Sequence, residues 1–261
     1  MISYITTHFS DFEWTRKWYE SIMAFRPRDY EYEIIIIDQD RSRESRERLQ
    51  MLGPLIKVVQ YPRSQRHFDI MGHDHAAVLN QVLRAASGEI ITIWDSDAHP
   101  VSVEWWGRCL RILENYDAIT ARDEEYHHLA HPCFMLLKQK HLALNLRFDE
   151  PLCEHEGDTG RQIAAQLVSS GEKTFLLEGS PCFGGKWGSM MLESVYHHGH
   201  GSYSGAGPRL SSQIDWRQSF FRKMVMNRAK YQLGLSDRFA FKCKIKWQNA
   251  KHRMKNLVRP L

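Results

Sequence analysis

Two aspartates separated by one serine, Asp95 and Asp97, are the residues of this sequence best placed to do chemistry. They directly follow the apolar run EIITIW, residues 89–94, which we expect to be a buried strand. Two carboxylates at this spacing can converge on one hard cation and leave positions open for water and phosphate oxygens. Mg²⁺ and Mn²⁺ favour such sites, and a divalent ion neutralises the charge that develops on a diphosphate leaving group. The alternative interpretation is a solvated turn.

The elements before this pair alternate between strand-like and helix-like patterns. We expect strands at residues 2–7, 32–38, 55–61 and 89–94. Between them we expect helices around 14–22, 41–52 and 73–87, with Gly88 stopping the last. This alternation predicts a doubly wound, mostly parallel α/β sheet. Ligands of such sheets bind beyond the carboxyl ends of the strands, where Thr7, Asp38 and Asp95 all lie.

The second half of the chain is less regular. Its apolar and β-branched segments predict further helices and strands, at residues 103–113, 117–120, 133–138, 159–170 and 173–178. Glycine and serine then dominate residues 179–212, which we expect to be flexible. We therefore divide the chain into a domain at 1–212, with halves at 1–100 and 101–212, and an extension at 213–261.

Composition limits the class of protein. The chain has 261 residues, 43% hydrophobic and 25% charged, as is ordinary for a globular protein. No run approaches the ~20 apolar residues of a membrane span. The sequence enters its first strand without a signal-like segment. The five cysteines have irregular spacing and no C-x-x-C pair, which is typical of reduced thiols in a cytoplasmic protein.

The charge is unevenly distributed. Residues 216–261 hold 13 Lys and Arg against one acid, a net charge of +12, so residues 1–215 carry −8. Trp216, Phe220 and Met224 lie at helical spacing opposite basic residues, and Trp247, Ala250 and Met254 repeat the arrangement. Such segments suit an anionic membrane surface, and packing of the apolar faces on the domain is the alternative. Nucleic-acid binding is not expected, because no recognised motif accompanies the charge.

A family resemblance rests on three stretches in order: ISYITTHFSDFEWTRKWYESI, YEIIIIDQDRSRE and HDHAAVLNQVLRAASGEIITIWDSDAHP. Together they resemble the nucleotide-binding half of family 2 glycosyltransferases with the GT-A fold. The resemblance implies a GT-A doubly wound, mostly parallel central sheet, here with a basic, mainly helical C-terminal extension. It also implies transfer of a sugar, with inversion, from a nucleotide-diphosphate sugar to a glycan or lipid-linked acceptor, with Mn²⁺ or Mg²⁺ as cofactor.

The resemblance also assigns roles to residues. It implies donor contacts at Thr7, Asp38, Asn80 and Asp95, and a cation held by Asp95 and Asp97. The loop after Asp38 reads QDRSRE and departs from the family's N-x-S-x-D, so Asp40 is a further candidate for contacts to the base and ribose.

Transfer to a hydroxyl needs a general base. The segment FDEPLCEHEGDTGR resembles the family stretch in which the second acid of a Glu-Asp pair is that base. Asp158 falls on this acid and Glu156 lies two residues before it, although Gly157 replaces the adjacent glutamate. The alternative for Asp158 is a structural role as the N-cap of the following helix.

Fourteen histidines raise the question of a metal site. A structural zinc site wants four clustered N or S ligands, and no cysteine pair supplies them. GT-A enzymes often add a histidine from a late Gly/Ser-rich loop to their cation site, and YHHGHGS fits that place. The resemblance therefore favours His198, and after it His197, as a third ligand, against a solvated loop histidine.

Two other functions compete with the glycosyltransferase. A nucleotidyltransferase acting on sugar phosphates shares the nucleotide-binding sheet and the acids, but it would normally show a Gly-rich loop after the first strand, where this chain has TTHFSDFEWTR. A non-catalytic homologue that binds a nucleotide sugar is the other alternative, kept open by the altered QDRSRE and EGD segments.

Overall fold

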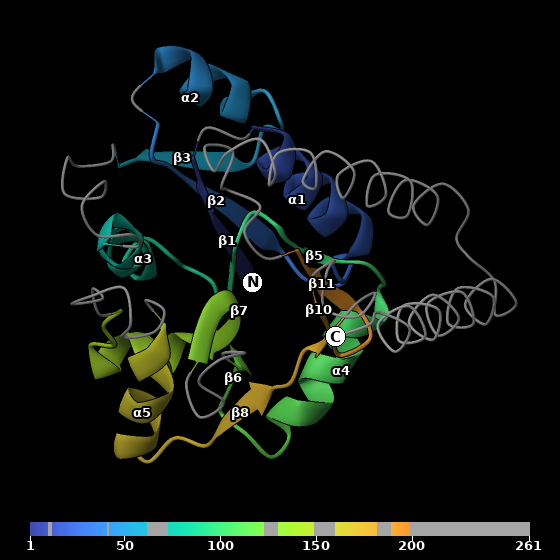
Figure 1. The fold of residues 1–261 in the computed structure, drawn as a ribbon, viewed down its shortest axis with the longest axis vertical. Helices are drawn as coiled ribbons and strands as arrows, with labels where there is room; N and C mark the ends of the chain where they lie inside the picture. Colours follow the sequence, from blue (N-terminus) through green and yellow to red (C-terminus); the bar gives the residue numbers. More distant parts are fainter. Residues whose placement is uncertain are drawn as a thin grey trace, which may run out of the picture.

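The computed structural model describes residues 1–9, 12–40, 42–61, 73–122, 130–148, 160–181 and 189–198. Its largest element is a sheet in the order β3-β2-β1-β4-β7-β6-β8 (Figure 1). The strands are β1 (Ile2–His8), β2 (Tyr32–Asp38), β3 (Ile56–Gln60), β4 (Ile90–Trp94), β6 (Ala118–Arg122), β7 (Ala130–Lys138) and β8 (Thr174–Leu177). Strand β7 runs antiparallel to β4 and β6, and the other neighbouring pairs are parallel. The predicted mostly parallel sheet is confirmed.

Helices cover both faces of this sheet. α1 (Phe12–Phe25), α2 (Arg43–Gln50) and α4 (Glu104–Leu113) contribute to one core, and α3 (His73–Leu83) and α5 (Arg161–Ser169) to the other. Figure 1 shows α1 and α4 on one side of the strands and α3 and α5 on the opposite side. Successive strand side chains point to opposite faces, so Tyr4 lies in the first core and Ile5 in the second. The fold is therefore doubly wound.

A second, smaller sheet has the order β5-β11-β10-β9. It consists of β5 (Ala98–Pro100), β9 (Ser180–Pro181), β10 (Ser189–Met191) and β11 (Val195–His197), paired antiparallel. The prediction of a flexible stretch from residue 179 onward was wrong for these strands. Strands of two or three residues are too short to show a period of two. They form by pairing with one another and, through β11, with β5, far away in the sequence.

Gly88 has a different role from the predicted one. α3 ends at Leu83, so Gly88 does not stop the helix. A Cβ at position 88 would lie 2.6 Å from the backbone nitrogen of Ser3, too close for any side chain. The Gly88 amide donates to the Ser3 hydroxyl at 2.8 Å. The glycine is thus required where the chain entering β4 crosses the start of β1.

The remaining described element is a 3₁₀ helix, η2 (Gln139–Leu144), after β7. No helix within the described ranges combines the length and apolar character needed to cross a bilayer. The predicted extension at residues 213–261 lies outside the described residues, so its helical character and the domain boundaries remain predictions.

Candidate active site

Asp95 and Asp97 lie in a turn between the two sheets. Asp95 directly follows β4 and Asp97 directly precedes β5. The turn is closed by the Ala98 amide, which donates to the Asp95 carbonyl at 2.9 Å. The Asp95 amide donates to the Cys133 carbonyl of β7 at 3.1 Å. The two carboxylates are therefore fixed to the edge of the main sheet through the backbone.

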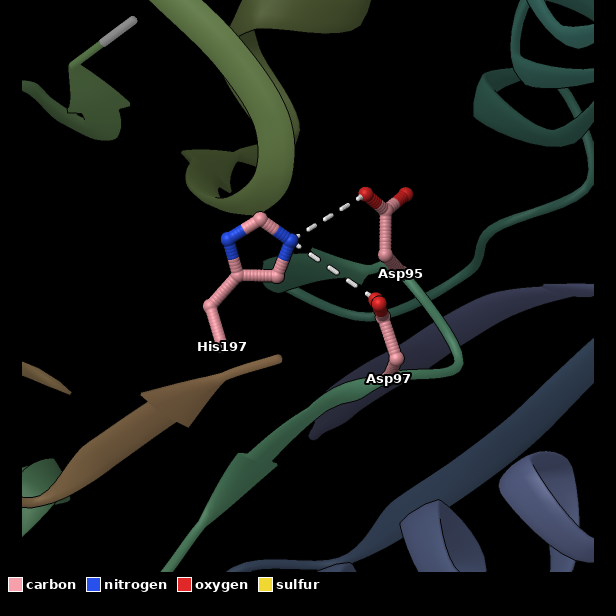
Figure 2. Close-up of side chains that lie close together, drawn as sticks. All are labelled: Asp95, Asp97 and His197. Atoms are coloured by element: carbon pink, nitrogen blue, oxygen red, sulfur yellow. Dashed lines mark ion pairs between the residues drawn. The ribbon is translucent and has the colours of Figure 1, made fainter. Parts of the chain in front are cut away.

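His197 joins this pair from β11. β11 pairs with β5 so that His197 lies opposite Ala98, next to Asp97. The His197 Nε2 atom is 3.6 Å from Asp97 Oδ1 and 4.0 Å from Asp95 Oδ2, as the dashed lines in Figure 2 show. One potential ligand atom from each of the three residues lies within 4.8 Å of the others.

His198 points elsewhere. Its backbone amide donates to the Asp97 carbonyl at 3.0 Å, but its ring packs against Trp14 at a centroid distance of 4.7 Å. Its Nδ1 atom is hydrogen-bonded to the Tyr196 hydroxyl at 2.8 Å. Of the two predicted histidines, the structure thus brings His197 to the carboxylates, and it packs the His198 ring in the interior.

The electrostatics of the cluster favour a cation. Asp97 is buried and Asp95 is half-buried. Burial and the neighbouring carboxylate of Asp97 raise the pKa of Asp95, because two negative charges in a poorly solvated site repel each other. A divalent ion relieves this repulsion, and two carboxylate oxygens with one imidazole suit Mn²⁺ or Mg²⁺ with water and phosphate oxygens. The residues present fit the predicted cation.

Three further side chains at this site were given no role by the sequence analysis. The Cys133 thiol contacts the imidazoles of His131 and His197. Burial raises the pKa of Cys133, but the electrostatic effect of His197 and His131 and their hydrogen bonds with the thiol outweigh it and lower that pKa. The His75 Nε2 atom lies 3.8 Å from Asp95 Oδ1, on the carboxylate oxygen that His197 does not approach.

The predicted donor residues lie at the ends of β1 and β2. Thr7 is half-buried near the end of β1, and the β1 and β2 ends are in register, with His8 opposite Asp38. Asp38 is buried, and its Oδ1 accepts from the Asp40 amide at 3.0 Å and the Ser45 hydroxyl at 3.1 Å. The carboxylate thus shapes the loop that leads into α2. Since β1 lies between β2 and β4, these strand ends and the Asp95 turn share one edge of the sheet.

Asn80 makes structural contacts. Its side-chain amide donates to the Phe148 carbonyl at 2.8 Å and accepts from the Phe148 amide at 2.8 Å. The side chain is therefore held by the backbone just before residues 149–159, which lie outside the described part of the chain. A donor contact by Asn80 remains a prediction.

Asp158 and Glu156, the two candidates for the base, also lie outside the described residues. The helix that follows them bears on one interpretation. α5 begins at Arg161 with Gly160 as its N-cap residue. The helix thus begins later than the pattern predicted, and the N-cap alternative for Asp158 lies outside the described residues.

Comparisons with solved structures identify the fold class. A Pyrobaculum calidifontis mannosyltransferase with GDP-Man and Mn²⁺ is similar, with a TM-score of 0.53, 14% identity and coverage of 98% of this chain and 87% of that one. GalNAc-T7 with UDP, GalNAc and Mn²⁺ is also similar, with a TM-score of 0.52 and 12% identity, and the match covers 67% of this chain and 42% of that one. A third similar structure is 4-diphosphocytidyl-2C-methyl-D-erythritol synthase from Anaerococcus prevotii. Its TM-score is 0.50 at 12% identity, and the match covers 85% of this chain and 98% of that one. With its sheet order and its Asp-Ser-Asp turn, this chain has the GT-A fold.

The sequence adds the family. Residues 3–127 match the model of glycosyl transferase family 2, and together with the GT-A fold this match supports a family 2-like glycosyltransferase. The matched region contains β1 to β6, the strand ends described above and both aspartates of the turn. No protein in the curated comparison matches the sequence.

Proposed function

We propose that this protein transfers a sugar from a nucleotide-diphosphate sugar to an acceptor hydroxyl, with inversion and with Mn²⁺ or Mg²⁺ as cofactor. The observation that carries the proposal is the convergence of Asp95, Asp97 and His197 at the sheet edge formed by the ends of β1, β2 and β4. Two similar structures hold Mn²⁺ together with GDP-Man or with UDP and GalNAc, which supports a donor of this class.

Along that edge, one group of residues would bind the cation and another would contact the nucleoside. Asp95, Asp97 and His197 would hold the cation, which supplies Lewis-acid neutralisation of the diphosphate when bound. Thr7, Asp38 and Asp40 would contact the nucleoside part of the donor, because they lie at the neighbouring strand ends. The proposed cation site follows β4, and the proposed nucleoside contacts lie at the ends of the neighbouring strands β1 and β2. This separation suits a donor whose diphosphate binds the cation while its nucleoside lies beside it.

On the acceptor side we propose Asp158 as the general base, with Glu156 as the alternative. The base takes the proton of the acceptor hydroxyl as this oxygen attacks the anomeric carbon and the bond to the diphosphate breaks. A glycan or lipid-linked acceptor, used in glycan or cell-surface polysaccharide synthesis, fits the family resemblance.

A donor panel tests this function. Purified full-length protein is incubated with UDP-, GDP- and dTDP-sugars, an extract-derived glycan acceptor and Mn²⁺, and release of the nucleoside diphosphate is measured. We expect one nucleotide class to be used and chelation of the metal to stop release. Release of pyrophosphate from a nucleoside triphosphate and a sugar phosphate would instead support a nucleotidyltransferase, which the Anaerococcus prevotii structure keeps as the second candidate. Metal-dependent donor binding without turnover under all conditions would support the non-catalytic binder.

We further propose that residues 216–261 dock this protein on the inner face of an anionic membrane, as a cytoplasmic protein bound peripherally. The support is the net charge of +12 in two amphipathic segments. Removing 216–261 should leave a folded domain that no longer sediments with anionic vesicles. Vesicle binding of the full chain should weaken steeply with salt, because exposed charges are screened over about 8 Å at physiological ionic strength.

Packing of this segment on the domain predicts the opposite outcome of both experiments. If the apolar faces of this segment pack on the domain, the truncated protein will be insoluble or unfolded by circular dichroism, and the full chain will ignore vesicles. Neutral vesicles of the same size serve as the control for non-specific sedimentation.

A further inference from the structure

Strand β7 is irregular where it passes the cation site. Along β6, Thr120 pairs with Met135 and the next residue, Ala121, pairs with His131. Pro132, Cys133 and Phe134 of β7 therefore face a single peptide step of β6, which is a β-bulge. Bulges bend a strand and re-aim its side chains, and they are frequent beside active sites. The proline suits this position because it has no amide to offer to the ladder.

Cys133, in the middle of the bulge, touches both sides of the site. Its carbonyl accepts from the Asp95 amide at 3.1 Å, and its thiol is hydrogen-bonded to the imidazole of His197. Cys133 as a whole residue is 3% exposed. His131 completes the group, since its Nδ1 atom accepts from the Cys133 amide at 3.0 Å and its ring lies 5.4 Å from the His197 ring.

We propose that Cys133 is a positioning residue of the cation site, whose thiol holds the His197 imidazole so that Nε2 faces Asp95 and Asp97. This inference rests on the proposed function for the identity of the cation. His197 is the last residue of the three-residue strand β11, and its backbone pairs with β10 and β5, but this pairing does not fix the rotation of the imidazole ring. Histidines that bind metals usually need such a partner, and losing it typically weakens metal affinity about 10- to 100-fold.

The geometry places the Cys133 thiol beside His197 and outside the group of atoms that would bind the cation. The three potential ligand atoms that lie within 4.8 Å of one another come from Asp95, Asp97 and His197. Cys133 approaches His197 from β7, a strand of the main sheet, whereas the two aspartates belong to the turn that leads into β5. The carboxylates and the thiol thus reach the imidazole from different elements.

The test is Mn²⁺ binding by isothermal titration calorimetry on the full chain, without nucleotide. Cys133→Ala should bind Mn²⁺ about 10- to 100-fold more weakly than wild type. Cys133→Ser keeps a polar hydrogen-bonding group and should recover most of the loss. Cys109→Ala is the matched control, because Cys109 is also a buried free cysteine but lies on α4 in the apolar core, and it should bind as wild type does. Circular dichroism confirms that each variant is folded.

Cys133→Val keeps most of the buried volume without the thiol and replaces the alanine variant if that protein does not fold. The proposal is overturned if folded Cys133→Ala or Cys133→Val binds Mn²⁺ as tightly as the Cys109 control. It is also overturned if Co²⁺ gives a thiolate charge-transfer band that Cys133→Ser lacks, because the sulfur would then be a direct ligand. A wild-type chain that does not bind Mn²⁺ overturns it as well. Since no donor is present, failure of the glycosyltransferase proposal would show separately, as absent turnover with Cys133-dependent Mn²⁺ binding intact.

Discussion

Replacing Asp97 with alanine should abolish sugar transfer and metal-dependent nucleotide binding while the fold stays intact. Asp97 is 5% exposed and supplies one of only three ligand atoms of the proposed site. Water cannot replace a lost carboxylate at a developing diphosphate charge. The backbone should not change, because the Asp97 carbonyl still accepts from the His198 amide. Turnover and calorimetric binding of a nucleoside diphosphate, each with and without Mn²⁺, measure the effect.

Asp29→Ala is a suitable control for this variant, since it removes an aspartate that is exposed and lies outside the site. It should leave turnover unchanged. Wild-type turnover in Asp97→Ala, with Mn²⁺ shown to be bound, would refute the role of the Asp95–Asp97 turn.

Asp158→Asn should lower turnover at least ~100-fold, the size typical of a general base, with little change in donor affinity. The amide keeps the size of the side chain but cannot accept a proton at neutral pH. Asparagine caps helices about as well as aspartate, so the loss cannot be attributed to a missing helix cap at position 158. Steady-state kinetics with saturating donor, together with donor titration, separate the two effects.

Glu156→Gln is the comparison that decides the alignment in this segment. We expect it to be much less damaging than Asp158→Asn. If the glutamine variant is the inactive one and Asp158→Asn retains turnover, the base is Glu156 and the alignment across Gly157 is shifted by two residues.

Much of the main sheet could be predicted from the sequence. Residues 34–37 of β2 are four consecutive isoleucines because both faces of this strand are buried. Ile34 and Ile36 lie in one core, and Ile35 and Ile37 lie in the other. Local periodicity therefore identified β1 to β4 and placed Thr7, Asp38 and Asp95 at strand ends. Parallel topology then required these ends to share one edge.

The rest of the site depends on contacts that a local pattern does not contain. His197 and His198 are adjacent, and which ring reaches Asp97 is decided by the register of β11 against β5. A shift of one residue would exchange them. Cys133 is found only once β7 is known to lie antiparallel beside β4. Pro132 in the run AHPCFMLLK indicates an irregular strand, but not which side chain the bulge aims at the site.

The most direct test of the central claim is the position of Mn²⁺ in crystals grown with Mn²⁺ and a nucleoside diphosphate, located by its anomalous scattering. We predict one strong peak bonded to Asp95, Asp97 and His197 and to phosphate oxygens of the nucleotide. A peak bonded to other residues, with the three side chains unliganded and the nucleotide bound away from the ends of β1, β2 and β4, would contradict the account.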